Sequence, residues 1–239
     1  MANIEDRHWW YRGLRAVIRD AWMRSVVVPA PRLLDVGCGT GANLAALREV
    51  AHPVGIDAAV DAIRFCRRRG LPHTVAGSAA ALPFAAESFD VALSCDVLSH
   101  RSLPDRSIPL AEIRRVLRPG GVLLLNVPAY QWMLSAHDRA VHQDHRFTRK
   151  EVRALLAGAG FAVERIGHWN AALMPAAVAV RWARRMSGRT GSDLARGSGE
   201  ALTGLFDAVL RAERALQPYV RMPFGLSIFA VARRPLDVP

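Results

Sequence analysis

Short apolar runs alternate with amphipathic stretches along the first half of the chain, a pattern typical of strands that alternate with helices. The apolar runs predict strands at residues 33–36, 52–57, 72–76, 88–96 and 122–127. Apolar positions at helical spacing predict helices at residues 43–50, 61–69 and 105–117. Strands and helices in this order build a parallel sheet with right-handed crossovers. We therefore expect a doubly wound α/β fold with helices on both faces of the sheet.

The second half of the chain departs from this alternation. It predicts a helix at residues 148–157, a strand at 161–166 and a last apolar strand at 226–233. Insertions at residues 128–147 and 170–224 separate these elements. The second insertion predicts helices at 173–186 and 202–216, which we expect to cap the sheet edge above a substrate pocket. The expected arrangement is one domain, with a core of residues 32–169 and 225–234 and a helical cap of residues 170–224.

Residues 1–31 precede this core and contain a predicted helix at residues 5–24, whose apolar positions share one face. An aromatic cluster, Trp9, Trp10 and Tyr11, lies near its start. Two interpretations of the cluster stay open. It packs the helix onto the core, or it forms a lid whose rings contact cofactor and substrate by cation–π attraction.

A glycine-rich turn follows the first predicted strand, in the segment LLDVGCGTGANL at residues 33–44. Gly37, Gly39 and Gly41 permit positive φ angles and let a ligand lie against the backbone. The helix that follows aims free N–H groups at the loop, as in nucleotide-binding sites. The glycine spacing alone also fits a dinucleotide. Asp35 favours a cofactor with a cationic part, such as S-adenosylmethionine, because a carboxylate there would repel a pyrophosphate.

This segment resembles motif I of the class I S-adenosylmethionine-dependent methyltransferases. The string LRPGG at residues 117–121 is a second resemblance, and HWWY at residues 8–11 is similar to the opening of bacterial members. The resemblance implies a seven-stranded, mostly parallel sheet in the order 3-2-1-4-5-7-6, with the last strand antiparallel between the fifth and the sixth.

The resemblance also implies where the cofactor binds. Asp57, 20 positions beyond Gly37, would bind the ribose hydroxyls, and Ser78 stands where the family often has an acidic residue near the adenine. The predicted cofactor-binding residues are Asp35, Gly37, Cys38, Gly39, Gly41, Asp57, Ala58, Ser78, Ala79, Asp96, Val97 and Leu98.

Methyl transfer from a sulfonium requires alignment of the acceptor with the methyl carbon and exclusion of water, and a general base assists when the acceptor is a hydroxyl. The candidate bases are His100, His137, His142 and His145. The candidate substrate contacts are Trp9, Trp10, Tyr11, Tyr130, Trp132 and Asp138. If the first insertion is helical, Asp138 and His142 share a face. A metal is an alternative ligand for this cluster, but two flanking arginines oppose a cation and we predict no metal site.

The formal net charge of +11 comes almost entirely from arginine, since Lys150 is the only lysine. Either GC-rich codon usage or attraction to an anionic substrate, membrane or nucleic acid explains it. The arginines are spread along the chain, so we expect no nucleic-acid partner, whereas peripheral membrane contact and the oligomeric state stay open. The three cysteines form no C-x-x-C pair, which argues against a disulfide framework or zinc site. The absence of a signal pattern and of a long apolar run predicts a cytoplasmic protein.

We expect methyl transfer from S-adenosylmethionine to a small hydrophobic acceptor: an isoprenoid, a lipid-linked molecule or a secondary metabolite. Two other functions stay open. One is an NAD(P)-dependent oxidoreductase, and the other is a cofactor-binding module of the same fold that transfers no methyl group.

Overall fold

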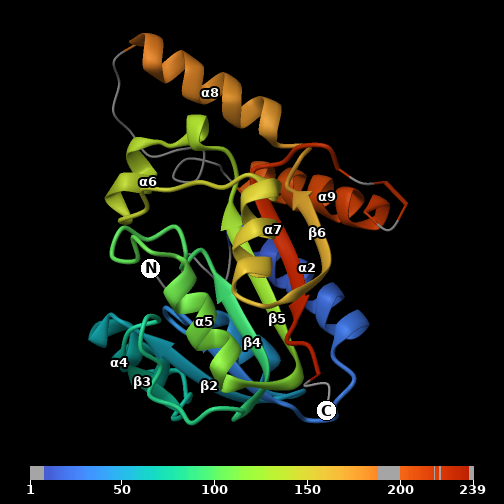
Figure 1. Ribbon diagram of the computed structural model, residues 1–239. Coiled ribbons are helices and arrows are strands. Elements are labelled where there is room, and N and C mark those ends of the chain that lie inside the picture. The colour runs from blue at the N-terminus through green and yellow to red at the C-terminus, as the bar shows by residue number, and fades with distance from the viewer. Residues whose placement is uncertain (1–7, 188–199, 218, 221, 237–239) are drawn as a thin grey trace.

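The computed structural model describes residues 8–187, 200–217, 219–220 and 222–236, and a seven-stranded sheet forms its centre (Figure 1). The sheet has the order β3-β2-β1-β4-β5-β7-β6. The strands are β1 (Arg32–Val36), β2 (His52–Asp57), β3 (Thr74–Ala76), β4 (Phe89–Cys95), β5 (Leu117–Pro128), β6 (Ala162–Trp169) and β7 (Ser227–Arg233). β7 is antiparallel to both β5 and β6, and the other pairs are parallel. The predicted fold class and strand order are confirmed.

Helices cover both faces of the sheet. They are α2 (Trp9–Ser25), α3 (Ala42–Leu47), α4 (Val60–Arg68), α5 (Ser107–Val116), α6 (Ala136–Ala140), α7 (Arg149–Gly158), α8 (Met174–Ser187) and α9 (Glu200–Leu216), with the short 3-10 helix η1 (Gln131–Met133). None of the helices in the described part of the chain is long and apolar enough to cross a membrane.

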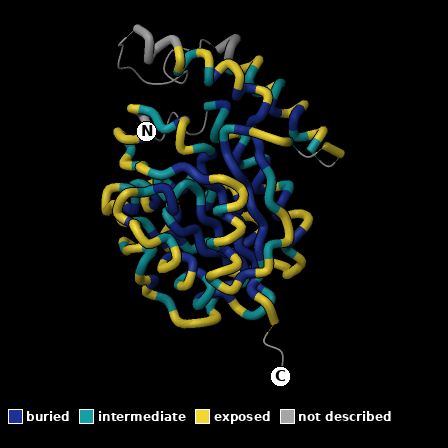
Figure 2. Tube along the Cα trace, turned by 45° about the horizontal axis from the view of Figure 1, so that its top comes forward, coloured by how far each residue is buried: buried dark blue, intermediate teal, exposed yellow. Residues whose placement is uncertain are grey.

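The two faces of the sheet carry separate hydrophobic cores, which form the buried centre of Figure 2. On one face, Leu110 and Ile113 of α5 and Leu156 of α7 pack against the strands. On the other face, the apolar side of α2 packs against β1, β4 and β5 through residues such as Leu14 and Ile18. α2 is therefore an integral layer of the fold, and only its N-terminal end reaches the edge where the strands end.

The helices of the second insertion separate rather than forming one cap over the sheet edge. α9 packs along α2, where Arg12 pairs with Asp207 at 2.9 Å and Arg214 pairs with Asp20 at 2.9 Å. α8 instead packs on η1 through a small apolar cluster that contains Met133. The single cap expected for residues 170–224 is thus two helices with different neighbours, and residues 188–199 between them lie outside the described residues.

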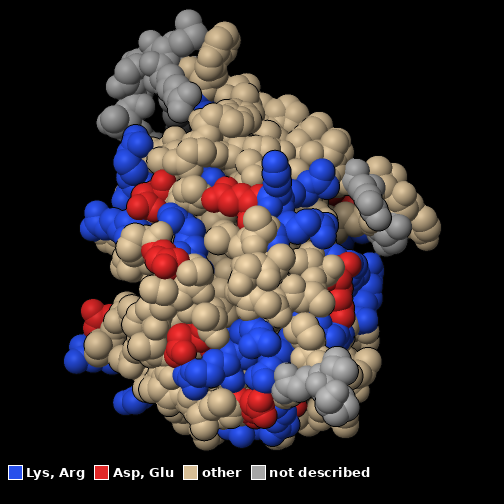
Figure 3. All heavy atoms as spheres, in the orientation of Figure 1, with Lys and Arg blue, Asp and Glu red and all other residues tan. Residues whose placement is uncertain are grey.

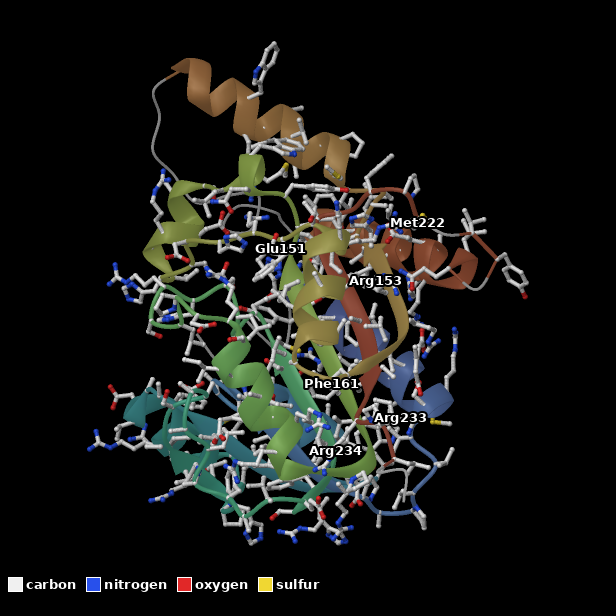
Figure 4. All side chains as sticks on the ribbon, viewed as in Figure 1. Glu151, Arg153, Phe161, Met222, Arg233 and Arg234 are labelled. Atoms are coloured by element: carbon white, nitrogen blue, oxygen red, sulfur yellow. The ribbon has the colours of Figure 1, made fainter. Side chains whose placement is uncertain are left out.

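Two arginines at the end of β7 form hydrogen bonds and ion pairs with neighbouring segments at the amino edge of the sheet, opposite the glycine loop. Arg234 donates to the backbone oxygen of Leu117 at 2.7 Å and pairs with Glu87 at 2.7 Å. Arg233 pairs with Glu164 and donates to Gly120. Figure 4 places both arginines at the lower end of β7, far from Met222 at the upper end. Part of the positive charge therefore serves internal ion pairing.

Strand β5 begins earlier than expected, because the predicted turn at residues 118–121 belongs to it. Phe89 pairs with Leu117 and Val91 pairs with Val122, so the register shifts between these two pairs. Gly120 has a φ of 80°, which accommodates the irregularity. The LRPGG string is thus an irregular start of the strand rather than a separate loop.

Candidate cofactor site at the carboxyl edge of the sheet

The glycine loop between β1 and α3 is a left-handed turn that only glycines accommodate without strain. Gly37, Gly39 and Gly41 have φ angles of 75°, 53° and 82°. A Cβ on Gly37 would lie 2.2 Å from Cγ2 of Val97, and one on Gly41 would lie 2.5 Å from Leu71. A Cβ on Gly39 would meet nothing within 4 Å. Side chains of the protein therefore pack against the loop at Gly37 and Gly41, whereas Gly39 is open and a ligand can approach the backbone there.

Asp57, at the end of β2, braces the same loop. Its Oδ2 accepts a hydrogen bond from the Gly39 N–H at 2.8 Å, and its Oδ1 accepts one from the Ala59 N–H at 2.8 Å. Each carboxylate oxygen has a second lone pair for a further donor. The geometry leaves Asp57 able to bind ribose hydroxyls as predicted, and it adds a structural function that the sequence did not indicate.

Asp35, in β1, is the most unusual residue of the site. It is 1% exposed, and neither carboxylate oxygen has a hydrogen-bond partner among the described residues. Burial, and to a lesser degree the charge of Asp57, raises the pKa of Asp35 to about 8. A buried carboxylate without donors is costly, so a cationic donor group bound at this place would relieve the cost.

Asp96, directly after β4, is held by a chain of hydrogen bonds that crosses the sheet edge. Asn126 of β5 donates to Oδ1 of Asp96 at 3.0 Å, and Trp169 of β6 donates to Asn126 at 2.8 Å. The Trp169 ring lies 5.9 Å from that of Trp10. Asp96 has a φ of 61°, a strained conformation that this network maintains. Burial raises the pKa of Asp96 to about 7, although the nearby Arg146 opposes the shift.

Asn126 and Trp169 are site residues that the sequence reasoning missed. Asn126 is the one polar residue in the apolar run 122–127, and it is completely buried. A buried amide in such a run needs partners, and this was the available signal. Trp169 lies beyond the predicted end of its strand and carried no comparable signal.

The other predicted cofactor residues lie around this edge in different ways. Ala58, Ser78 and Ala79 follow the ends of β2 and β3, and Ser78 is exposed and accepts a hydrogen bond from the Ala80 N–H at 3.1 Å. Cys38 is buried beneath the loop in a small cluster with Cys66. Val97 stays partly exposed beside Gly37, whereas Leu98 is 1% exposed and packs in the hydrophobic core. Leu98 thus supports the site from behind instead of lining it.

The predicted histidine cluster does not come together on a helix. α6 contains only residues Ala136–Ala140, and His142 lies in a turn with a φ of 63°. His145 lies 2.6 Å from Glu151, and Nδ1 of His100 lies 2.7 Å from the Ser102 hydroxyl. The shared helical face expected for residues 138 and 142 is therefore wrong, because the helix ends between them. The side chain of His137 lies outside the described residues.

Asp138 forms a buried ion pair with Arg146 that organises the first insertion. Oδ1 lies 2.7 Å from the Arg146 guanidinium, and Oδ2 accepts hydrogen bonds from both the N–H and the hydroxyl of Ser135. Burial would raise the pKa of Asp138, but the hydrogen bonds and charge of Arg146 lower it overall. These contacts assign Asp138 to holding the loop and do not support the expected substrate contact. Among the described residues, no group of three or more metal-binding side chains converges.

The predicted aromatic residues fall into two groups. At the start of α2, Trp9 is 7% exposed and packs on Phe206 of α9, with ring centroids 5.2 Å apart, while Trp10 and Tyr11 are partly exposed. The second group lies after β5, where Tyr130 stacks on both Trp132 and His168. The Tyr130 hydroxyl lies 3.0 Å from Nε2 of His168, a buried histidine that the sequence reasoning did not select.

The geometry fits S-adenosylmethionine. Asp35 offers an unsatisfied carboxylate to the α-ammonium of its methionine part, the open face at Gly39 accommodates a ligand against the backbone, and Asp57 can accept further hydrogen bonds. The pyrophosphate of a dinucleotide has no cationic group that could pair with Asp35. Asp57 does not distinguish the two cofactors, since each contains a ribose. The residues present therefore suit a cationic nucleoside cofactor.

Comparison with known proteins gives the same class of domain. Residues 34–125 match a family described as "Methyltransferase domain". The chain is 44% identical over 105 residues, 41% of its length and 38% of the relative's, to a phthiotriol/phenolphthiotriol dimycocerosates methyltransferase of Mycobacterium ulcerans. It is 35% identical over 123 residues, 48% of its length and 43% of the relative's, to a fatty-acid O-methyltransferase of Mycolicibacterium smegmatis.

A human protein named probable tRNA methyltransferase 9B is 36% identical over 112 residues, 46% of this chain and 23% of the relative. The chain thus spans less than half the length of these three relatives. In fold, it is similar to an S-adenosylmethionine-dependent methyltransferase from Mesorhizobium loti, with a TM-score of 0.63 and 18% identity over 96% of this chain and 100% of that chain.

Proposed function

We infer that this chain belongs to the class I S-adenosylmethionine-dependent methyltransferase superfamily and transfers the methyl group of S-adenosylmethionine to a small hydrophobic acceptor. The match of residues 34–125 to a methyltransferase domain supports this proposal. The observation that carries the proposal is the buried carboxylate of Asp35, which precedes the glycine loop and has no hydrogen-bond partner in the described part of the chain. It suits a methyl donor with a cationic methionine part and opposes the pyrophosphate of a dinucleotide. This charge argument favours methyl transfer over hydride transfer by an NAD(P)-dependent enzyme.

A hydrophobic acceptor is supported by the residues above the sheet edge. Tyr130, Met133, Met174, Ala177 and Leu226 form an apolar cluster between η1 and α8, beside the ends of β5 and β7. Two relatives are named for methylation of fatty acids and of phthiotriol lipids. A third relative is named as a probable tRNA methyltransferase. Nucleic acid has less support here, because the arginines are spread along the chain and form no single tract in the sequence.

S-adenosylmethionine supplies an electrophilic methyl group and a neutral leaving group, so the protein needs no acid catalyst. We assign the binding of the donor to Asp35 and Asp57, and the exclusion of water to the aromatic residues at the start of α2. Alignment of this kind contributes ~7–11 kcal/mol to such reactions. A base is needed only where the acceptor is a neutral hydroxyl.

We assign the base to Asp96 in place of the histidines. Asn126 holds one of its oxygens, which leaves the other to accept a proton at the edge where β4 ends. Its pKa of about 7 suits proton transfer near neutral pH. In His145 and His100, by comparison, one ring nitrogen of each is already engaged, by Glu151 and by the Ser102 hydroxyl. For a hydroxyl acceptor, Asp96 would take the proton as the oxygen bonds to the methyl carbon and the carbon–sulfur pair leaves with sulfur.

A turnover assay tests the proposal. The protein is incubated with methyl-tritiated S-adenosylmethionine and hexadecanol, 4-nonylphenol, geranylgeraniol or palmitic acid, and label in the organic phase is counted. We expect transfer to at least one of these apolar acceptors and none with Asp35→Asn. A chain that binds S-adenosylhomocysteine but labels none of them would contradict the acceptor class. A chain that binds NADH instead would contradict the cofactor.

A further inference from the structure

The outward face of α8 is apolar and unpartnered among the described residues. Met174 and Ala177 face inward and are buried against Met133 of η1. The opposite positions, Pro175, Ala176 and Ala179, are exposed, and Trp182 continues the same face with 69% of its surface exposed. Exposed apolar surface that includes a tryptophan is unfavourable in water and is typical of an interaction site.

A second exposed tryptophan lies in the neighbouring segment. Trp132 of η1 is 54% exposed and stacks on Tyr130. Arg181, next to Trp182 in sequence, donates a hydrogen bond to the backbone oxygen of Met133, next to Trp132. That contact ties the two tryptophan-bearing segments together at the carboxyl edge of the sheet.

Cationic side chains surround this edge. Arg139 of α6 and Arg149, Lys150 and Arg153 at the start of α7 are all exposed. In Figure 3 the surface at the top, where α8 lies, is largely uncharged outside the grey atoms, and blue side chains gather below it. The acidic residues among them, Asp144 and Glu151, are fewer, and Glu151 is engaged by His145.

We propose that α8 and η1, with the basic residues of α6 and α7, form a docking surface for an anionic lipid bilayer. Tryptophan rings sit at the headgroup level of membranes, where the apolar body is buried and the indole N–H stays hydrated. The cations complement anionic headgroups at the same depth. An apolar helix face flanked by arginine and lysine is the pattern of a helix that lies in the interface plane.

This arrangement fits a bilayer better than a protein partner. Trp182 and Trp132 are both mostly exposed and lie on separate segments, whereas the hot spot of a protein interface is a well-packed central cluster. Docking would also turn the carboxyl edge of the sheet, with the cofactor loop, toward the membrane. Bilayer binding stands on these surfaces alone and does not depend on which acceptor is methylated.

Sedimentation with vesicles tests the proposal on the full chain. Vesicles are made of phosphatidylcholine alone or mixed with phosphatidylglycerol, and bound protein is measured in the pellet. We expect binding to the anionic vesicles, and a loss of about tenfold or more in the Trp132→Ser/Trp182→Ser double variant. Replacement of Arg149, Lys150 and Arg153 by glutamine should weaken binding by about fivefold per charge.

Met23→Ser is the matched control, because Met23 is 77% exposed at the far end of α2. It should bind vesicles like the unaltered chain. Binding of S-adenosylhomocysteine by each variant verifies that the fold and the cofactor site persist, and so separates this proposal from the function proposed above. In the unaltered chain, brominated lipid should quench tryptophan fluorescence.

Three results would overturn the proposal: no sedimentation with anionic vesicles, equal sedimentation with neutral ones, or a double variant that binds as tightly as Met23→Ser. Absence of quenching by brominated lipid would overturn it even if the double variant failed to fold.

Discussion

Lowering the pH should weaken the binding of S-adenosylhomocysteine, because protonation of Asp35 removes the carboxylate that receives the ligand's α-ammonium. The unliganded protein buries Asp35 without a partner among the described residues, and its pKa stands at about 8. At about pH 6, roughly one molecule in a hundred carries the charged form, against about half at pH 8. If only that form binds, the affinity at pH 6 falls about 50-fold, or about 2 kcal/mol.

Calorimetric titration measures this effect directly. Below about pH 8, binding should release a proton from Asp35, so the observed heat should differ between buffers of different ionisation enthalpy. Asp35→Asn should bind weakly and with no such pH dependence. Asp61→Asn, at an exposed position on α4, is the matched control and should behave like the unaltered chain.

The stability of the unliganded protein provides a second measurement of the same group. The pKa of Asp35 is raised on folding, so the native state holds a proton that the unfolded chain releases between about pH 4 and pH 8. The free energy of unfolding therefore falls as the pH rises from about 4 to about 8, because unfolding releases this proton. Asp35→Asn should therefore unfold at higher temperature than the unaltered chain above about pH 8. Constant affinity from pH 6 to pH 8, or full affinity in Asp35→Asn, would refute the reasoning.

Three further predictions concern the loop, the first insertion and the base. Arg146→Met should lower the free energy of unfolding by about 3–5 kcal/mol, because it leaves Asp138 buried and unpaired, and Asp138→Leu added to it should restore much of the loss in thermal denaturation. Gly37→Ala should abolish cofactor binding in calorimetry, because its Cβ would meet Val97 at 2.2 Å and its φ is 75°, and Val97→Ala should relieve only the contact. Asp96→Asn should lower turnover of a hydroxyl acceptor by about 10²–10⁴-fold and remove the rise in rate up to about pH 7. Turnover of palmitate, whose carboxylate needs no base, should stay within a few-fold. A variant that keeps the pH profile of the unaltered chain would contradict the base assignment.

The seven strands were predictable from the apolar runs along the chain, whereas their order in the sheet came from the family resemblance. Asp35 was predictable as a site residue because a carboxylate is out of place in a buried strand. Its lack of partners could be known only from the structure, since donors elsewhere in the chain could have reached it. The same holds for Asp57, whose contact with Gly39 depends on how β2 sits beside the loop.

The first insertion shows where sequence reasoning failed. If residues 136–145 formed one helix, Asp138 and His142 would share a face, but α6 ends at Ala140. Ser135 and Asp138 exchange hydrogen bonds at the start of α6, and Asp138 pairs with Arg146 in the loop beyond it. A loop whose shape depends on one buried ion pair has no periodic signal. The tertiary contacts of Asn126, Trp169 and His168 were hidden for the same reason, since each partner lies on another strand or beyond it.

Transfer of a labelled methyl group tests the central claim most directly. The protein is mixed with S-adenosylmethionine that carries a deuterated methyl group and with a bacterial total lipid extract, and products are separated by mass spectrometry. We predict a lipid or isoprenoid species that gains the deuterated methyl group, with formation of S-adenosylhomocysteine, in the unaltered chain and not in Asp35→Asn. Label that remains entirely in S-adenosylmethionine, although the protein binds it, would contradict the account.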